Sequence, residues 1–211
     1  MVFFSALVLA SALASALAAP VAERPIESRA LPSVIAVSTA KTYLSELTVA
    51  TESNSPAYDR DLFKTWDIIS GTCDTRETVL KRDGTNVVTD SSCKATSGSW
   101  TSSYDGATTT DPSTFDIDHL VPLKEAWISG AKDWTSAQRE SFANDVTRPQ
   151  LIAVSASSNR SKGDKDPASW VPTQTSFVCT YVRAYIQVKH FYDLSVDSDE
   201  KAALQSFLAD C

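Results

Sequence analysis

The sequence is organised around one short apolar run that carries an aspartate and a histidine in its middle, Phe115-Asp116-Ile117-Asp118-His119-Leu120-Val121-Pro122-Leu123. The chain has two histidines, and His119 is one of them. A short apolar run bounded by turn-forming residues predicts a β-strand. Neighbouring strand residues point to opposite faces, so Asp118 and His119 serve one site only if the strand ends or bends there, which the nearby Pro122 favours.

A carboxylate beside an imidazole suits a site that holds a metal ion and a base. A neutral imidazole takes a proton from water at physiological pH. A hard divalent cation neutralises charge on a phosphate and takes oxygen ligands from carboxylates and amides. Asp118 offers the carboxylate and Asn159, forty-one positions later, the amide oxygen. These residues predict phosphodiester hydrolysis, whereas a core histidine, a strand-end cap and a surface helix residue are the structural alternatives.

The composition describes an acidic chain. There are 26 acidic and 19 Lys and Arg residues, giving a formal net charge of −7. Strong non-specific nucleic-acid binders are usually basic. This balance argues against a protein that holds nucleic acid tightly, and it is compatible with an enzyme that binds briefly and releases.

The chain begins with an uncharged segment. Residues 1–19 carry no charged side chain and end in a small-x-small pattern, which predicts a secretory signal peptide cleaved after Ala18 or Ala19. Residues 20–33 contain three prolines and predict a linker or short pro-segment. No later stretch is apolar for long enough to span a bilayer. We therefore expect a secreted, extracellular, monomeric domain over 34–211, with no membrane contact after signal removal.

The cysteine count indicates a disulfide-stabilised domain. An even number of cysteines in a secreted chain predicts two disulfides among Cys73, Cys93, Cys179 and Cys211. Three pairings exist. Cys73–Cys93 with Cys179–Cys211 is favoured because each bond then closes a local segment.

Periodicity and capping signals predict an α+β fold. Helices are expected near 40–47, over 75–81, from a Thr135/Gln138 capping box to about Val146, and in the tail, where Phe177, Tyr181 and Tyr185 lie at i+4 spacing. Residues 86–104 predict two strands or a hairpin. A strand over 151–154 leads into a helix that Ser155 caps and Gly163 ends. Around the Asp-His pair the order is strand, inserted helix, strand, short helix.

The stretch 116–172 resembles the HNH, or His-Me finger, nucleases. The matching pieces are Asp-His-Leu-Val-Pro-Leu at 118–123, Pro-Gln-Leu at 149–151, Asn-Arg-Ser-Lys-Gly-Asp-Lys-Asp-Pro at 159–167, and Trp170. The most similar branch is the secreted family related to the C-terminal domain of GmrSD-type restriction enzymes. The order and spacing of these pieces is more specific than a bare Asp-His pair.

The resemblance implies a ββα-metal core with flanking helices. It implies that His119 is the general base and that Asp118 and Asn159 ligate one divalent cation. Magnesium is expected, with manganese or calcium as alternatives. The family position that orients the base is usually Asn and falls near Gln150 here; Asn144 is the other candidate. Glu125 is expected as a further ligand or as a carboxylate behind the ligands, or else as a salt-bridged helix start.

Four basic residues make a locally positive patch, for which phosphate contact and a solvated helix face are the two interpretations: Arg148, Arg160, Lys162 and Lys165. The resulting expectation is a secreted metal-dependent endonuclease acting on DNA, with RNA left open. One alternative is a non-catalytic secreted binding protein or effector on the same fold. Another is a hydrolase that uses Asp116 and Asp118 as paired carboxylates on one strand face, as glycosidases do.

Overall fold

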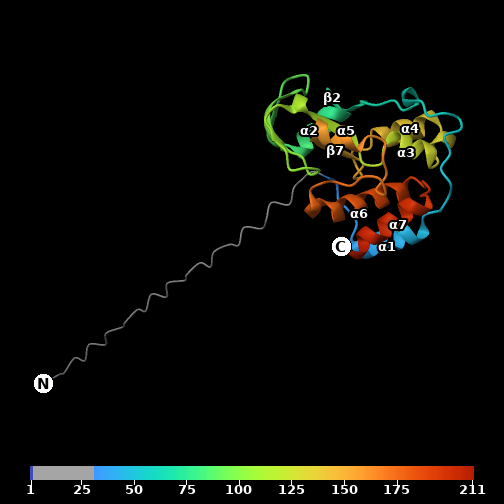
Figure 1. Cartoon of the computed structure of the whole chain (residues 1–211). Coiled ribbons are helices and arrows are strands. Elements are labelled where there is room, and N and C mark those ends of the chain that lie inside the picture. Colours follow the sequence, from blue (N-terminus) through green and yellow to red (C-terminus); the bar gives the residue numbers. More distant parts are fainter. Residues whose placement is uncertain (2–30) are drawn as a thin grey trace.

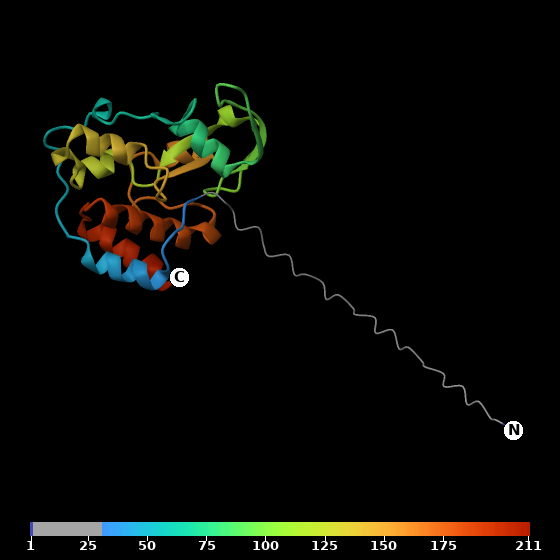
Figure 2. The same ribbon diagram turned by 180° about the vertical axis from the view of Figure 1, so that it is seen from behind.

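The computed structural model describes Met1 and residues 31–211, and it shows a mixed α/β fold with two disulfides. The predicted signal peptide beyond Met1, and residues 20–30 of the predicted linker, lie outside the described residues. The described chain forms two layers (Figures 1 and 2). One layer contains α1, α6 and α7, and the other contains the strands and the shorter helices.

The helical layer joins the two ends of the described chain. Helix α1 (Val37–Glu46) packs against α6 (Thr175–Phe191) and α7 (Ser198–Ala209). Ala40 and Leu44, four positions apart, are both buried, so α1 turns one apolar stripe toward the two later helices. The Cys179–Cys211 disulfide, with 5.6 Å between Cα atoms, ties α6 to the residues that follow α7.

The other layer contains three small antiparallel sheets. Strands β1 (Ile68–Ser70) and β2 (Cys73–Asp74) form the first, and β3 (Thr85–Thr89), β4 (Ala95–Thr101) and β5 (Thr108–Thr109) form the second. Between them, α2 (Thr75–Asp83) begins with a capping box. The Cys73–Cys93 disulfide, with 5.0 Å between Cα atoms, joins the start of α2 to the turn between β3 and β4. Both favoured disulfide pairings are confirmed.

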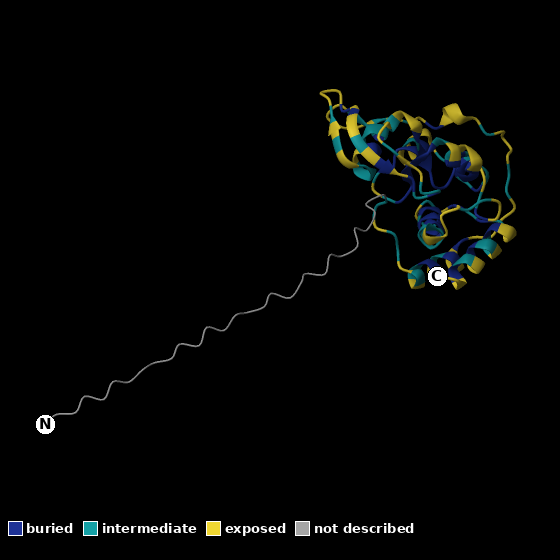
Figure 3. Cartoon of the chain, turned by 60° about the vertical axis from the view of Figure 1, so that its left-hand side comes forward, coloured by how far each residue is buried: buried dark blue, intermediate teal, exposed yellow. Residues whose placement is uncertain are grey.

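The third sheet carries the Asp-His pair. Strand β6 (Phe115–His119) pairs antiparallel with β7 (Leu151–Ser155), and α5 (Ala156–Lys162) follows β7 and packs on both strands. The insertion between the strands holds α3 (Leu123–Ile128) and α4 (Ser136–Ala143). All five residues of β7 are buried, so the sheet lies within the molecule (Figure 3).

Several local predictions are confirmed and some boundaries move. Helix α4 opens with the predicted capping box and ends at Ala143, three residues earlier than expected. The chain before β1 forms a short 3-10 turn (Arg60–Leu62), and two further 3-10 turns cover Pro112–Thr114 and Ala131–Asp133. Within residues 31–211 no helix has the length and apolar character needed to cross a membrane.

Candidate active site

A cavity of about 240 Å³ opens where β6 ends and α5 runs past it. Its walls come from the 3-10 turn at 60–62, the end of β6, the start of α3, and α5 with the residues that follow it. The lining residues are Arg60, Ile117, Asp118, His119, Pro122, Leu123, Asn159, Arg160, Gly163 and Asp164. The predicted base and both predicted ligands therefore border one space.

His119 is the last residue of β6, as a shared site with Asp118 requires. Its Nε2 lies 2.9 Å from the carbonyl oxygen of Ala143, at the C-terminal end of α4. Because a carbonyl only accepts hydrogen bonds, Nε2 carries the proton and Nδ1 holds the free lone pair. Burial, and then the positive charges of Arg60 and Lys162, lower the pKa of His119 to about 4, against the Ala143 carbonyl. The imidazole is therefore neutral at physiological pH.

The group that orients the imidazole is a backbone carbonyl. Gln150, expected in this role, instead receives a hydrogen bond from the Val121 amide at 3.1 Å and donates one to the Val121 carbonyl at 2.9 Å. It fixes the turn after β6. The Asn144 side chain bonds the backbone of Lys64 and Asp67. Both side chains therefore form hydrogen bonds with backbone groups near them. The group that bonds the imidazole of His119 is the carbonyl of Ala143.

Asp118 is buried, and both carboxylate oxygens have partners. Lys162 Nζ lies 2.9 Å from Oδ1, and the Tyr104 hydroxyl donates to Oδ2 at 2.5 Å. Burial raises the pKa of Asp118 and lowers the pKa of Lys162, while their mutual attraction opposes both shifts. At 2.9 Å this attraction favours the ionised pair.

Asn159 lies on α5 and faces β6. Its Nδ2 donates a hydrogen bond to Asp116 Oδ2 at 3.0 Å. Because a carboxylate only accepts hydrogen bonds, this atom is the nitrogen of the side-chain amide, and the remaining polar atom is the oxygen Oδ1. A carboxylate oxygen has more than one lone pair, so Asp118 Oδ1 and Oδ2 keep acceptor capacity beside Lys162 and Tyr104. Asp118 and Asn159 therefore form an oxygen-only donor set at one cavity, which is the chemistry that a hard divalent cation prefers.

Glu125 does not line this cavity. It is buried on α3, and its Oε1 accepts a hydrogen bond from Lys189 Nζ at 2.7 Å. The same ammonium bonds Glu200 at 2.7 Å and the Ser195 carbonyl at 2.9 Å. The structure therefore places the predicted further ligand in an ion cluster that joins α3, α6 and α7.

The four predicted phosphate-binding residues separate into different environments. Arg160 is exposed and lines the cavity. Lys162 is fully buried against Asp118 and the His119 carbonyl, where a phosphate in the cavity cannot reach its ammonium. Lys165 is exposed and bonds the Ser161 carbonyl. Arg148 lies outside the cavity, where it bonds Asp145 and covers the Phe191 ring at 3.1 Å.

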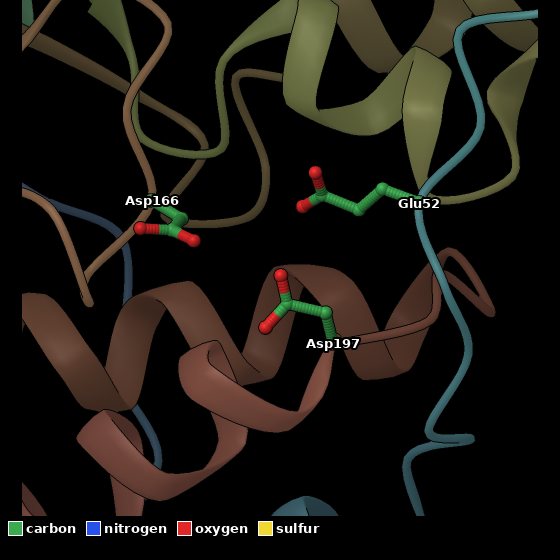
Figure 4. Close-up of side chains that lie close together, drawn as sticks. All are labelled: Glu52, Asp166 and Asp197. Carbon is green, nitrogen blue, oxygen red and sulfur yellow. The ribbon is translucent and has the colours of Figure 1, made fainter.

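A second group of acidic side chains lies apart from the cavity. Glu52, Asp166 and Asp197 point toward one another from three separate segments (Figure 4). Carboxylate oxygens of this acidic triad lie within 4.8 Å of one another, a spacing that a single cation can bridge. Asp166 and Asp197 also accept backbone hydrogen bonds from Ser169 and Glu200, so local chain geometry accounts for two of the three positions.

Comparison with known proteins places this fold and site in a family. The model of the C-terminal domain of GmrSD restriction endonucleases matches residues 74–207. The chain belongs to that family. The match spans α2 to most of α7 and includes both β6 and α5, so every residue that lines the cavity except Arg60 lies within the matched region.

One secreted protein is similar to this chain over most of its length. A protein of Arthroderma benhamiae, described as an uncharacterized secreted protein, is 58% identical over 180 residues, which cover 85% of this chain and 88% of that protein. No solved structure gives a significant match. The secreted relative and the two disulfides confirm the predicted extracellular location.

For two residues of the site, the sequence predicts no role. Arg60 lines the cavity from a segment that reads as a polar loop, 58 positions before Asp118. Tyr104 is fully buried and donates to Asp118 from the chain after β4. Periodicity carries no signal for either contact, because both depend on how distant segments pack.

Proposed function

We propose that this chain is a secreted, monomeric, metal-dependent endonuclease that hydrolyses phosphodiester bonds of DNA, with RNA as a second substrate to be tested. The observation that carries the proposal is the state of His119. The imidazole is neutral, its Nε2 proton is donated to the Ala143 carbonyl, and its Nδ1 lone pair is free at a cavity that Asp118 and Asn159 also border. A proton acceptor held in one tautomer is what activation of water needs.

In this proposal β6, β7 and α5 form a ββα-metal core. Asp118 and Asn159 would hold one divalent cation, with magnesium as the expected ion and manganese or calcium as alternatives. When bound, such a cation supplies charge neutralisation at the phosphate and at the leaving oxygen. Lys162 and Tyr104 hold the Asp118 carboxylate in place. In this proposal the two ligands, Asp118 and Asn159, are held in fixed positions by the chain.

The remaining steps use side chains that line the cavity. A water molecule loses its proton to His119 Nδ1 as its oxygen attacks the phosphorus, and the bond from phosphorus to the 3′-oxygen breaks. The 3′-oxygen then takes a proton from solvent water, which gives a 5′-phosphate and a 3′-hydroxyl. Arg60 and Arg160 line the cavity and bind the phosphate oxygens. A phosphate anion beside His119 raises the pKa of the imidazole above its value of about 4, which strengthens the base when substrate is present.

A cleavage assay with a matched histidine control tests the proposal. The secreted protein is incubated with supercoiled plasmid and with RNA, in magnesium, manganese, calcium or EDTA. His119→Ala is expected to lose activity by a factor of about 100 or more. His190→Ala is the control, because that imidazole stacks on Tyr43 and bonds Glu46 in the helical layer. Cleavage in EDTA, or full activity of His119→Ala, contradicts the mechanism.

A second candidate function is a non-catalytic secreted binding protein on the same fold. The pairing of Asp118 with Lys162 favours it, because an ammonium already neutralises the predicted ligand. The two candidates differ in one measurement besides activity. If the chain is a metal-dependent enzyme, a divalent cation is expected to raise the thermal midpoint of the wild-type protein more than that of Asn159→Ala, whereas for a non-catalytic protein the shift is the same in both.

A further inference from the structure

An exposed tryptophan stands beside the proposed base. Trp66 lies between the 3-10 turn at 60–62 and β1, and its ring centroid is 6.5 Å from that of His119, with the two planes inclined at 45°. The residue keeps 38% of its surface exposed. A tryptophan that only covers a buried histidine would stabilise the fold most if its own apolar surface were buried as well. Part of Trp66 therefore stays in contact with solvent beside His119, although the residue is not among those that line the cavity.

The backbone holds this tryptophan in a conformation that a bulky residue rarely adopts. Its φ angle is 66°, in the left-handed region where β-carbon contacts disfavour residues other than glycine. Such strain persists when neighbouring contacts fix it, and it gathers at functional sites. The contacts here come from Asn144, which donates to the Lys64 carbonyl at 2.8 Å and accepts from the Asp67 amide at 3.0 Å. The two bonds bracket Trp66.

One helix end positions both rings. Asn144 follows Ala143 directly, and the Ala143 carbonyl is the group that holds His119. The end of α4 thus fixes the imidazole with a backbone group and the indole segment with a side chain. Arg60, six residues before Trp66, lines the cavity. The segment 60–66 therefore brings a cation to the cavity and an aromatic face to the proposed base.

We propose that Trp66 is a stacking platform for the nucleobase next to the phosphate that is cleaved, and that the substrate strand is unpaired at that base. The inference rests on the proposed nuclease function. A nucleobase offers a flat face that stacks on an indole regardless of sequence, while its own phosphate carries the charge that Arg60 and Arg160 attract. A paired base inside a duplex has its faces covered by its neighbours, so stacking on Trp66 selects single-stranded or locally opened substrate.

The test measures binding and cleavage with a short labelled single strand, a matched duplex, and single strands that lack one base at successive positions. Binding is measured in EDTA by fluorescence anisotropy with the full secreted chain. Trp66→Leu keeps an apolar cover over His119 without an aromatic face, and Trp66→Phe keeps a smaller one. Phe191→Leu is the control, since Phe191 is an exposed aromatic residue whose ring contacts Arg148 and not His119.

Trp66→Leu is expected to weaken single-strand binding and to raise KM by about 5- to 100-fold, whereas Trp66→Phe keeps most of the affinity. The loss is expected to be the same at low and high salt, because stacking releases few counterions, while the loss for Arg60→Ala shrinks as salt rises. Among the strands that lack one base, the wild-type protein is expected to bind one more weakly than the others, namely the strand without the base that stacks on Trp66. Trp66→Leu is expected to bind all of these strands equally.

The outcomes separate this inference from the nuclease proposal. If the wild-type protein binds and cleaves but Trp66→Leu matches it on every strand, the stacking platform is refuted and the nuclease proposal stands. If the wild-type protein binds single strands through Trp66 yet never cleaves, base stacking on Trp66 is supported and the nuclease proposal is refuted. Absence of any binding by the wild-type protein refutes the stacking platform. If Trp66→Leu loses as much affinity for the duplex as for the single strand, the selection of unpaired bases is refuted.

Discussion

Replacement of Lys189 by methionine tests the ion cluster that joins α3, α6 and α7. The side chain is fully buried, and its ammonium bonds Glu125 and Glu200, each at 2.7 Å, and the Ser195 carbonyl at 2.9 Å. Methionine has a similar length and no charge. The substitution therefore leaves two buried carboxylates without their countercharge and one carbonyl without its donor.

Removal of one partner from a buried ion pair costs about 3–5 kcal/mol. For a domain of this size we expect the thermal midpoint to fall by about 6–20 °C. The loss depends on pH. Burial raises the pKa of Glu200 to about 7 and Lys189 opposes that shift, so its removal raises the pKa further. An acid with a raised folded-state pKa is destabilising once ionised, so the loss is largest above pH 7 and shrinks as pH falls.

Urea unfolding at pH 5 and pH 8, in EDTA, measures both parts of the prediction. Lys165→Met is the matched control, because that lysine is exposed and bonds only the Ser161 carbonyl; its expected change is within about 0.5 kcal/mol. Adding Glu125→Gln and Glu200→Gln to Lys189→Met is expected to recover most of the loss. A loss below about 1 kcal/mol, or one that is equal at both pH values, refutes the reasoning.

Four further substitutions have defined outcomes. Burial, and then neighbouring carboxylates, raise the pKa of Glu52 to about 7, so Glu52→Gln is expected to raise the thermal midpoint at pH 8.5 in EDTA and to raise it much less at pH 5, because the penalty shrinks as pH falls from the folded pKa toward the unfolded one. Gln150→Ala removes both hydrogen bonds that hold the turn after β6 and is expected to lower stability by about 2–5 kcal/mol in urea. Lys162→Met leaves its buried carboxylate partner uncompensated, so we expect a lower midpoint in EDTA and a larger rise with magnesium than wild type shows in differential scanning fluorimetry. Arg148→Ala, outside the cavity, is expected to leave KM for cleavage unchanged and to cost about 1 kcal/mol of stability.

Local signals in the sequence predict the parts of the fold that depend on local contacts. The Thr135 and Gln138 side chains form the expected capping box, and Ser155 caps α5 as expected, because each cap is complete within four residues. The predicted order strand, inserted helix, strand, helix around His119 is also correct, except that the insertion holds two α-helices, α3 and α4, where one was expected. Both disulfides follow the rule of local closure, since they join residues 20 and 32 positions apart.

The site depends on contacts that the linear pattern does not carry. The sequence leaves Glu125 open between a metal ligand and a salt-bridged helix start; the structure shows the second, with an ammonium partner that lies 64 positions away. The group that holds His119 is a backbone carbonyl, which no side-chain motif can specify. The burial of Lys162 also depends on packing. Ser158 and Lys162 lie four positions apart on one face of α5 and both are buried, yet neither is an apolar residue that would mark this face in the sequence.

The burial of Lys162 against Asp118 also affects how an acidic chain can bind a polyanion. Lys162 is neutralised by Asp118, so the cations that line the cavity are Arg60 and Arg160. Two phosphate contacts give a slope of log affinity against log salt of about −1.4 for a single strand, far below that of a protein with six to ten contacts. Stacking on Trp66 would add affinity without adding to that slope. A net charge of −7 is then consistent with cleavage, because repulsion from the rest of the surface speeds product release while two arginines and one indole hold the bond that breaks. A slope much steeper than −1.4 requires phosphate contacts beyond the cavity and contradicts this account.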